Sequence, residues 1–84
     1  MPQQEPAAGD RLLCEIAAEI LGDWKNPYFG AVPYLDAMCR LESTDDQFGE
    51  QDGDEIVAYF LSNAASWRGA VARRVKAELN EMIS

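Results

Sequence analysis

Apolar residues recur along most of the chain with the spacing of helices. After Asp10 they lie one, three or four positions apart, which places them on one face of a helix. These residues are Leu13, Ile16, Ala17, Ile20 and Leu21. Asp10 is a good N-cap residue and Gly22 is a natural stop. The pattern therefore predicts a first helix from Asp10 to Gly22.

A segment rich in proline and aromatic residues follows. The stretch NPYFGAVPY, 26–34, holds two prolines, a glycine and three aromatic rings but no charge. Because proline lacks a backbone donor, Pro27 and Pro33 fit best in a bend or in the first turn of a helix. We therefore expect a turn at 26–30 and a second helix from Pro33 to about Leu41. The side chains expected to point inward from that helix are Tyr34, Leu35, Met38 and Leu41.

The C-terminal half of the chain has two further helical patterns. The stretch EIVAYFLSNAA, 55–65, is apolar nearly all round, which is typical of a central helix. Asp52 can cap this helix, and Glu55 can return the bond in a capping-box-like arrangement. Ser66 can cap a fourth helix. The residues of this fourth helix that we expect to point inward are Trp67, Val71, Val75, Leu79 and Met82. The apolar stripe keeps its phase over 56–82, so one long bent helix is an alternative.

These patterns predict an all-α fold, a small four-helix domain with short connections. No segment has a strand signal and no internal repeat is present. Residues 1–9 contain prolines and glutamines without apolar periodicity, so we expect a flexible tail there. Residues 10–84 then form a single helical domain. A domain of this size buries roughly 60–65% of the surface of its unfolded chain, which leaves little room for a deep dry pocket.

The composition and the first residues of the chain indicate in which cellular compartment the protein is expected. The chain is 48% hydrophobic and 26% charged, as in an ordinary globular domain. Two cysteines, Cys14 and Cys39, are too few for a disulfide scaffold, and the polar start MPQQEPAAGD does not resemble a signal peptide. We therefore expect a cytoplasmic protein with free thiols. No apolar run approaches the roughly 20 residues that cross a bilayer, and the net charge of −8 is repelled by anionic lipids. We expect no membrane partner.

Residue types that serve catalysis or metal binding are scarce. The chain has no histidine, which removes the commonest general base and the commonest metal ligand. The stretch FGEQDGDE, 48–55, lacks the lysine of a phosphate-binding loop. The acidic stretch 45–55 has no register that satisfies the twelve-residue calcium loop. We therefore expect that the protein is not an enzyme and uses no metal or cofactor.

Charge is unevenly distributed along the chain. The segment 42–55 has seven acidic residues and no basic one, and we expect a solvated loop there. One interpretation is that its carboxylates serve solubility alone. The alternative is that they form the contact surface for a basic partner. The candidate contact residues in this segment are Glu42, Asp45, Asp46, Glu50, Asp52 and Asp54.

The last predicted helix is the basic end of the chain. Four of the seven positive charges lie there, namely Arg68, Arg73, Arg74 and Lys76. Such a cluster can bind nucleic acid. Arg74, however, can pair with Glu78 one turn later, and the net charge repels a phosphate backbone. Direct nucleic-acid binding is therefore the less favoured interpretation.

The rings of the proline-rich region carry a second candidate contact. Trp24, Tyr28, Phe29 and Tyr34 have more ring area than one exposed loop keeps in water at low cost. We expect them to fold back over the third and fourth helices and to meet Phe60 and Trp67. The alternative is a partly exposed patch that recognises another protein, with Trp24 and Tyr28 as the contact.

Two stretches of the chain contain a distinctive pattern of aromatic, glycine and basic residues. They are DWKNPYFGAVPYLDAM at 23–38 and VAYFLSNAASWRGAVARRVKAEL at 57–79. They resemble a family of short, functionally unassigned proteins carried by phages, prophages and integrative elements of bacteria. The likeness covers roughly residues 12–80. The resemblance implies a small accessory protein of a mobile element, often one that interferes with a host system. It implies no active site.

Together, these features predict a small acidic accessory protein that binds and blocks a protein of the bacterial host. A nucleic-acid-binding defence component is the expected kind of target, so the function would be of the anti-CRISPR or antirestriction type. One alternative is a self-associating structural or regulatory phage protein. Another is a small DNA-binding regulator that uses the basic fourth helix. We expect a monomer or a weak homodimer.

Overall fold

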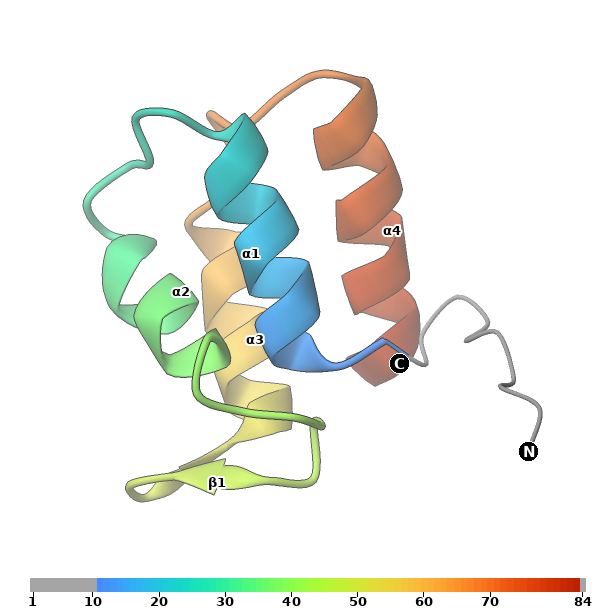
Figure 1. Ribbon diagram of the computed structural model, residues 1–84. Coiled ribbons are helices and arrows are strands. Elements are labelled where there is room, and N and C mark those ends of the chain that lie inside the picture. The colour runs from blue at the N-terminus through green and yellow to red at the C-terminus, as the bar shows by residue number, and fades with distance from the viewer. Residues whose placement is uncertain (1–10, 84) are drawn as a thin grey trace, which may run out of the picture.

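A computed structural model describes residues 11–83 of the chain. The elements in this part are α1 (Leu13–Asp23), α2 (Val32–Met38), β1 (Gln47–Phe48), β2 (Gln51–Asp52), α3 (Gly53–Ser62) and α4 (Ala70–Ile83) (Figure 1). The predicted fold class, a small all-α domain of four helices, is confirmed. The expected tail at 1–9 and Asp10 itself lie outside the described residues. The expected start of the first helix directly after Asp10 is wrong, because α1 begins at Leu13 with Leu12 as its N-cap residue.

The helices enclose one apolar core. In Figure 1, α1 lies in front of α3, with α2 and α4 on either side. Both α2 and α4 contact α1 as well as α3. Each of the three longer helices contributes side chains that are fully buried: Leu13, Ile16 and Ile20 from α1, Ile56, Val57 and Phe60 from α3, and Val75 and Leu79 from α4. These residues are among those whose spacing predicted the helices.

The start of α3 has the predicted cap. The Asp52 side chain accepts a hydrogen bond from the Glu55 backbone N–H at 3.1 Å. The Glu55 carboxylate accepts one in return from the Asp52 backbone N–H at 3.4 Å. The capping box read from the sequence is therefore confirmed, because its partners lie only three residues apart.

The alternative of one long helix is wrong. Helix α3 ends at Ser62 and α4 begins at Ala70. Gly69 has a φ of 116°, a left-handed conformation that a continuous right-handed helix does not contain. The expected start of the fourth helix directly after Ser66 is also wrong. Trp67 is buried as expected, but it lies in the connection before the helix.

The segment between α2 and α3 contains a short hairpin that the sequence did not predict. Strands β1 and β2 are antiparallel, with Gln47 opposite Asp52 and Phe48 opposite Gln51. Gly49 occupies the turn with a φ of 68°, which glycine adopts at little cost. Strands of two residues are too short to show an alternating pattern, so the hairpin carries no periodic signal.

Two expected helix ends are shifted. Helix α1 continues past Gly22 to Asp23, and Leu21, expected to point inward, is 46% exposed. Leu21 lies beside the face that α1 buries, and the core is filled without it. Helix α2 begins at Val32, just before Pro33, and ends at Met38. Leu41 is still buried, but it follows the helix.

Candidate functional site

Trp24 belongs to the core of the domain. Its ring stacks on the ring of Trp67, with centroids 5.8 Å apart and an interplanar angle of 14°. It also meets Phe60 edge-on at 6.3 Å. The Trp67 indole N–H donates a hydrogen bond to Asp23 at 2.9 Å. The expectation that Trp24 folds back to meet Phe60 and Trp67 is confirmed, whereas Trp24, only 7% exposed, is not available as the partner contact that was the alternative.

Three other residues of the same region form an exposed apolar surface. Phe29 is 79% exposed, and Tyr28 and Val32 are 45% and 46% exposed. The Tyr28 and Phe29 rings contact each other, with centroids 4.8 Å apart. The expectation that Tyr28 and Phe29 are covered by the third and fourth helices is therefore wrong. We call Tyr28, Phe29 and Val32 the aromatic surface.

The backbone beneath the aromatic surface is held in place. The Ala31 N–H donates to the Tyr28 carbonyl at 2.8 Å, and Ala31 itself is fully buried. A Cβ atom at Gly30 would come within 2.6 Å of the Tyr28 ring and 2.8 Å of the Asn63 side-chain oxygen. A larger residue at position 30 would have to displace these two side-chain ends. The rings are therefore presented by an ordered turn.

A pocket adjoins Tyr28. It has a volume of about 230 Å³ and is lined by Tyr28, Ser62, Asn63, Ala65 and Ser66. It lies where the turn before α2 approaches the connection between α3 and α4. A pocket beside exposed rings can receive a side chain of a partner, which is the arrangement found at the centre of protein interfaces.

The acidic segment lies at the other end of the molecule from the α3–α4 connection, around the hairpin (Figure 1). Two of its candidate contact residues have structural roles. Asp46 accepts hydrogen bonds from the backbone N–H groups of Glu42 and Ser43 at 3.0 and 3.1 Å, and Asp52 caps α3. The remaining candidates are exposed carboxylates: Glu42, Asp45, Glu50 and Asp54.

Residues 11–83 contain neither a cluster of metal-ligand side chains nor a helix that could span a bilayer. No group of three or more Asp, Glu or Cys side chains in this range is arranged to hold a metal ion. No helix in the same range has the length and apolar character needed to cross a bilayer. Cys14 and Cys39 are both free thiols, as expected.

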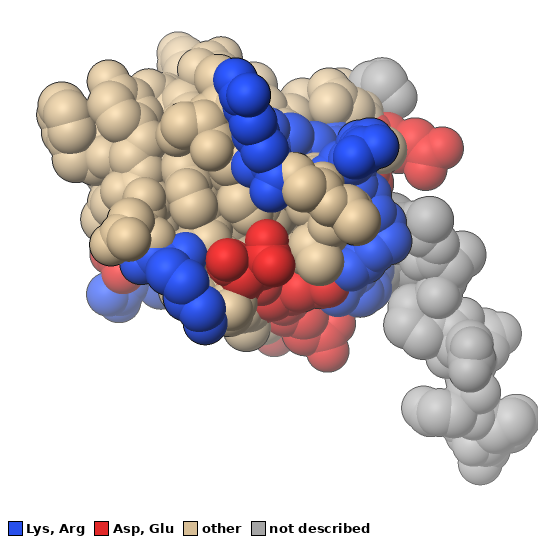
Figure 2. Space-filling view, turned by 90° about the horizontal axis from the view of Figure 1, so that it is seen from above, with Lys and Arg blue, Asp and Glu red and all other residues tan. Residues whose placement is uncertain are grey.

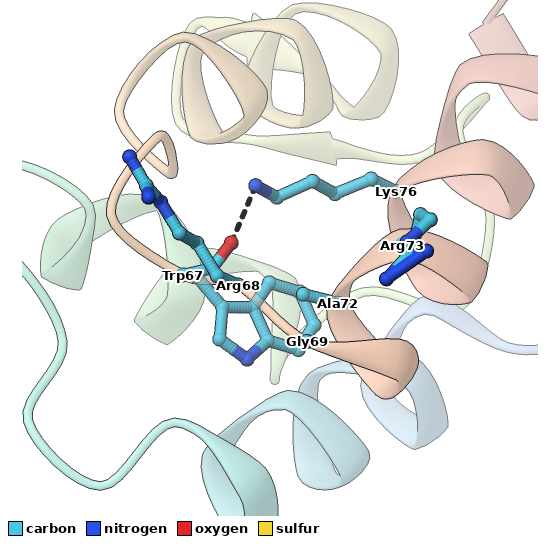
Figure 3. Close-up of a pocket in the computed structure, with 6 residues that line it drawn as sticks. All are labelled: Trp67, Arg68, Gly69, Ala72, Arg73 and Lys76. Carbon is cyan, nitrogen blue, oxygen red and sulfur yellow. Dashed lines mark hydrogen bonds between the residues drawn. The ribbon is translucent and has the colours of Figure 1, made fainter.

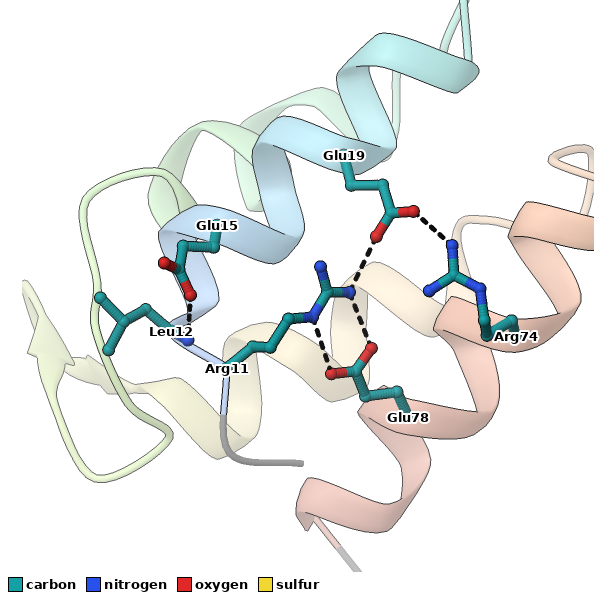
Figure 4. A network of polar contacts seen from close by, with 6 residues as sticks. All are labelled: Arg11, Leu12, Glu15, Glu19, Arg74 and Glu78. Carbon is teal, nitrogen blue, oxygen red and sulfur yellow. Dashed lines mark hydrogen bonds and ion pairs between the residues drawn. The ribbon is translucent and has the colours of Figure 1, made fainter. Parts of the chain in front are cut away.

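Some basic residues of the C-terminal region are paired and others are exposed. Arg74 pairs with Glu19 of α1 and not with Glu78, the partner predicted within its own helix (Figure 4). Glu78 pairs instead with Arg11, in the segment before α1. Arg68 and Arg73 are exposed at the start of α4. Figure 2, which looks down on this end of the molecule, shows Lys and Arg side chains in several groups with Asp and Glu side chains between them, beside a larger uncharged area.

Sequence reasoning did not single out Phe29 as a contact residue or recognise the pocket beside Tyr28. The only signal was the uncharged Tyr28–Phe29 pair next to a glycine, and the sequence alone does not say which of the neighbouring rings is buried. Searches of protein-family models, curated proteins and solved structures find no match to this chain. The resemblance to mobile-element proteins therefore stays a prediction.

Proposed function

We propose that this protein is a binding protein rather than an enzyme, and that it acts by contacting another protein through the aromatic surface. The observation that carries this proposal is the 79% exposure of Phe29 beside the half-exposed Tyr28. Leaving a phenylalanine ring in water costs about 1.5–3 kcal/mol relative to burying it. Aromatic residues also dominate the energy of protein interfaces.

The rigid support of the aromatic surface favours the same function. Backbone hydrogen bonds from Ala31 to Tyr28 and from Val32 to Phe29 order the turn before any partner arrives. Binding then costs less conformational entropy than it would for a flexible loop. The adjoining pocket offers a place for one side chain of the partner.

We further propose that the partner belongs to a bacterial host and that binding blocks its function, which rests on the resemblance to mobile-element proteins. Exposed carboxylates at the hairpin end would attract a basic partner and speed association. They are Glu42, Asp45, Glu50 and Asp54. A nucleic-acid-binding protein presents such a basic surface, so this class remains the proposed target.

The test compares Phe29→Ala with a matched control, Phe48→Ala. Phe48 is also an exposed aromatic residue, at 41%, but it lies on the hairpin at the other end of the molecule. We expect wild type and Phe48→Ala to retain the same protein from a bacterial lysate, and Phe29→Ala to lose it. With that protein purified, Phe29→Ala should bind at least about tenfold more weakly. Equal binding by both variants would overturn the role of the aromatic surface.

Self-association is a second candidate function, and the same exposed rings favour it. The proposed contact is then a second copy of the chain. Sedimentation velocity over a range of concentrations tests this candidate. Dimer formation by wild type and Phe48→Ala, with Phe29→Ala remaining a monomer, would show that the partner is a second copy. A monomer at all concentrations would exclude it.

A further inference from the structure

A pocket at the start of α4 brings together basic side chains that the aromatic surface does not use. It has a volume of about 270 Å³ and is lined by Trp67, Arg68, Gly69, Ala72, Arg73 and Lys76 (Figure 3). Three of these six residues are cations. The chain has only seven Lys and Arg against fifteen Asp and Glu, so a pocket with three cations in its lining is opposite to the overall composition.

No carboxylate within residues 11–83 pairs with these three cations. Elsewhere in that range, arginines have acidic partners: Arg11 pairs with Glu78, and Arg40 pairs with Asp36. In Figure 3, the side chains of Arg68 and Arg73 lie on opposite sides of the pocket, and both residues are exposed. Their guanidinium groups are therefore available to an anion from solution.

Lys76 is the half-buried cation of the pocket and lies against Trp67. Its ammonium donates a hydrogen bond to the Trp67 carbonyl at 2.7 Å and lies 5.9 Å from the centroid of the Trp67 ring. Burial lowers the pKa of Lys76, and the nearby charge of Arg68 lowers it further. An anion placed between these groups would relieve both effects, since an opposite charge favours the protonated amine.

We propose that this pocket binds a phosphate group, carried by a small phosphate monoester. Guanidinium groups donate two parallel hydrogen bonds to phosphate, and an ammonium adds a point charge. Gly69 and Ala72 leave space beside the first turn of α4, whose backbone N–H groups favour an anion as well. A monoester carries about −1.5 to −2 charges at pH 7, which matches a site with three cations.

A small ester fits the whole molecule better than a nucleic acid does. The protein carries a net charge of −8, and a long polyanion would be repelled outside the pocket. The indole of Trp67 is only 2% exposed, so it offers no open face on which a base could stack. The pocket thus recognises the phosphate group itself.

The experiment follows amide resonances during titration with inorganic phosphate, adenosine monophosphate or a short single-stranded oligonucleotide, each at constant ionic strength. Phosphate and the monophosphate should shift the resonances of residues 68–73 and saturate. The double variant Arg68→Gln/Arg73→Gln should bind at least about tenfold more weakly. The control Lys25→Gln/Arg40→Gln removes the same charge from exposed positions outside the pocket and should bind as wild type does.

Equal loss in the two double variants would overturn the proposal, because only overall charge would then matter. Absence of saturation with either small probe at millimolar concentration would overturn it too. If the oligonucleotide saturates the pocket at a much lower concentration than the monophosphate, the proposal of a small ester is wrong and the ligand is a nucleic acid. Phe29→Ala should bind phosphate normally, so this proposal and the aromatic contact can fail separately.

Discussion

Arg11 and Glu78, 67 residues apart in the chain, are joined by two parallel hydrogen bonds of 3.0 and 2.8 Å (Figure 4). Glu78 is only 8% exposed. The same guanidinium lies 2.8 Å from a carboxylate oxygen of Glu19, which in turn pairs with Arg74. This network ties the segment before α1 to both α1 and α4, and so joins the two ends of the described chain.

We expect Arg11→Ala to lower the free energy of unfolding by about 1–3 kcal/mol, because it removes the bidentate partner of a largely buried carboxylate. The control is Arg40→Ala, which breaks the exposed ion pair with Asp36. Such exposed pairs contribute about 0–1 kcal/mol. Urea denaturation measures both changes. Equal losses would show that the burial of Glu78 does not matter.

The stability of the protein should depend on Glu19 at acidic pH. Arg74 first, and then Arg11, lower the pKa of this carboxyl group below its ordinary value. A group with a lowered pKa in the folded state stabilises above its unfolded pKa of about 4.3, and this stabilisation is lost as pH falls through the folded pKa. Glu19→Gln should therefore be less stable than wild type at pH 7 and should lose less stability on acidification. Parallel curves of unfolding free energy against pH would contradict this.

Truncation of Phe60 should destabilise the protein far more than truncation of Phe29. Phe60 is fully buried and meets the stacked rings of Trp24 and Trp67 edge-on, with centroids 6.3 and 6.4 Å away. Phe60→Ala should cost about 3–5 kcal/mol, because it leaves a cavity in a small core. Phe29→Ala should change stability by less than about 0.5 kcal/mol, since that ring is exposed. Chemical denaturation measures the free energy of unfolding of both variants. A large loss of stability in Phe29→Ala would show that this ring is part of the core.

The acidic end should contain two kinds of carboxylate. Asp46→Ala removes the acceptor of two backbone N–H groups and should destabilise by about 1–2 kcal/mol. Neutralising the exposed carboxylates together should leave the melting temperature unchanged or raise it at low salt, because like charges repel. That variant replaces Glu42, Asp45, Glu50 and Asp54 by Gln or Asn. A marked loss of stability in it would assign these residues a structural role.

The thiol of Cys39 should react slowly in the folded protein. Although Cys39 is an exposed residue, partial burial of its thiol raises the pKa, and the charge of Asp36 raises it further. Because the thiolate is the reactive form, alkylation by iodoacetamide at pH 8 should be slower than for an unperturbed cysteine. After unfolding, Cys14 and Cys39 should both be alkylated without prior reduction, since both are free. Mass spectrometry follows both steps, and a pair that requires a reductant would contradict the prediction.

The sequence by itself determined the all-α class and most of the core, but it left open whether 56–82 forms one helix or two. Leu13, Ile16 and Ile20 are buried where their spacing predicted, and the capping box of Asp52 and Glu55 forms as predicted. These features depend on residues within one or two helical turns of each other. Local backbone geometry alone relates such residues, so their spacing in the sequence is sufficient to predict them.

Tertiary structure decided which rings and charges face outward. Trp24 and Phe29 lie five positions apart in one aromatic segment, yet Trp24 stacks on Trp67 while Phe29 is exposed. Arg74 has a good partner one turn away in the sequence, yet its pair with Glu19 joins two helices. Side chains compete for a core of limited size and for partners on other elements. The outcome of that competition depends on the packing of segments far apart in the chain, which residue spacing does not specify.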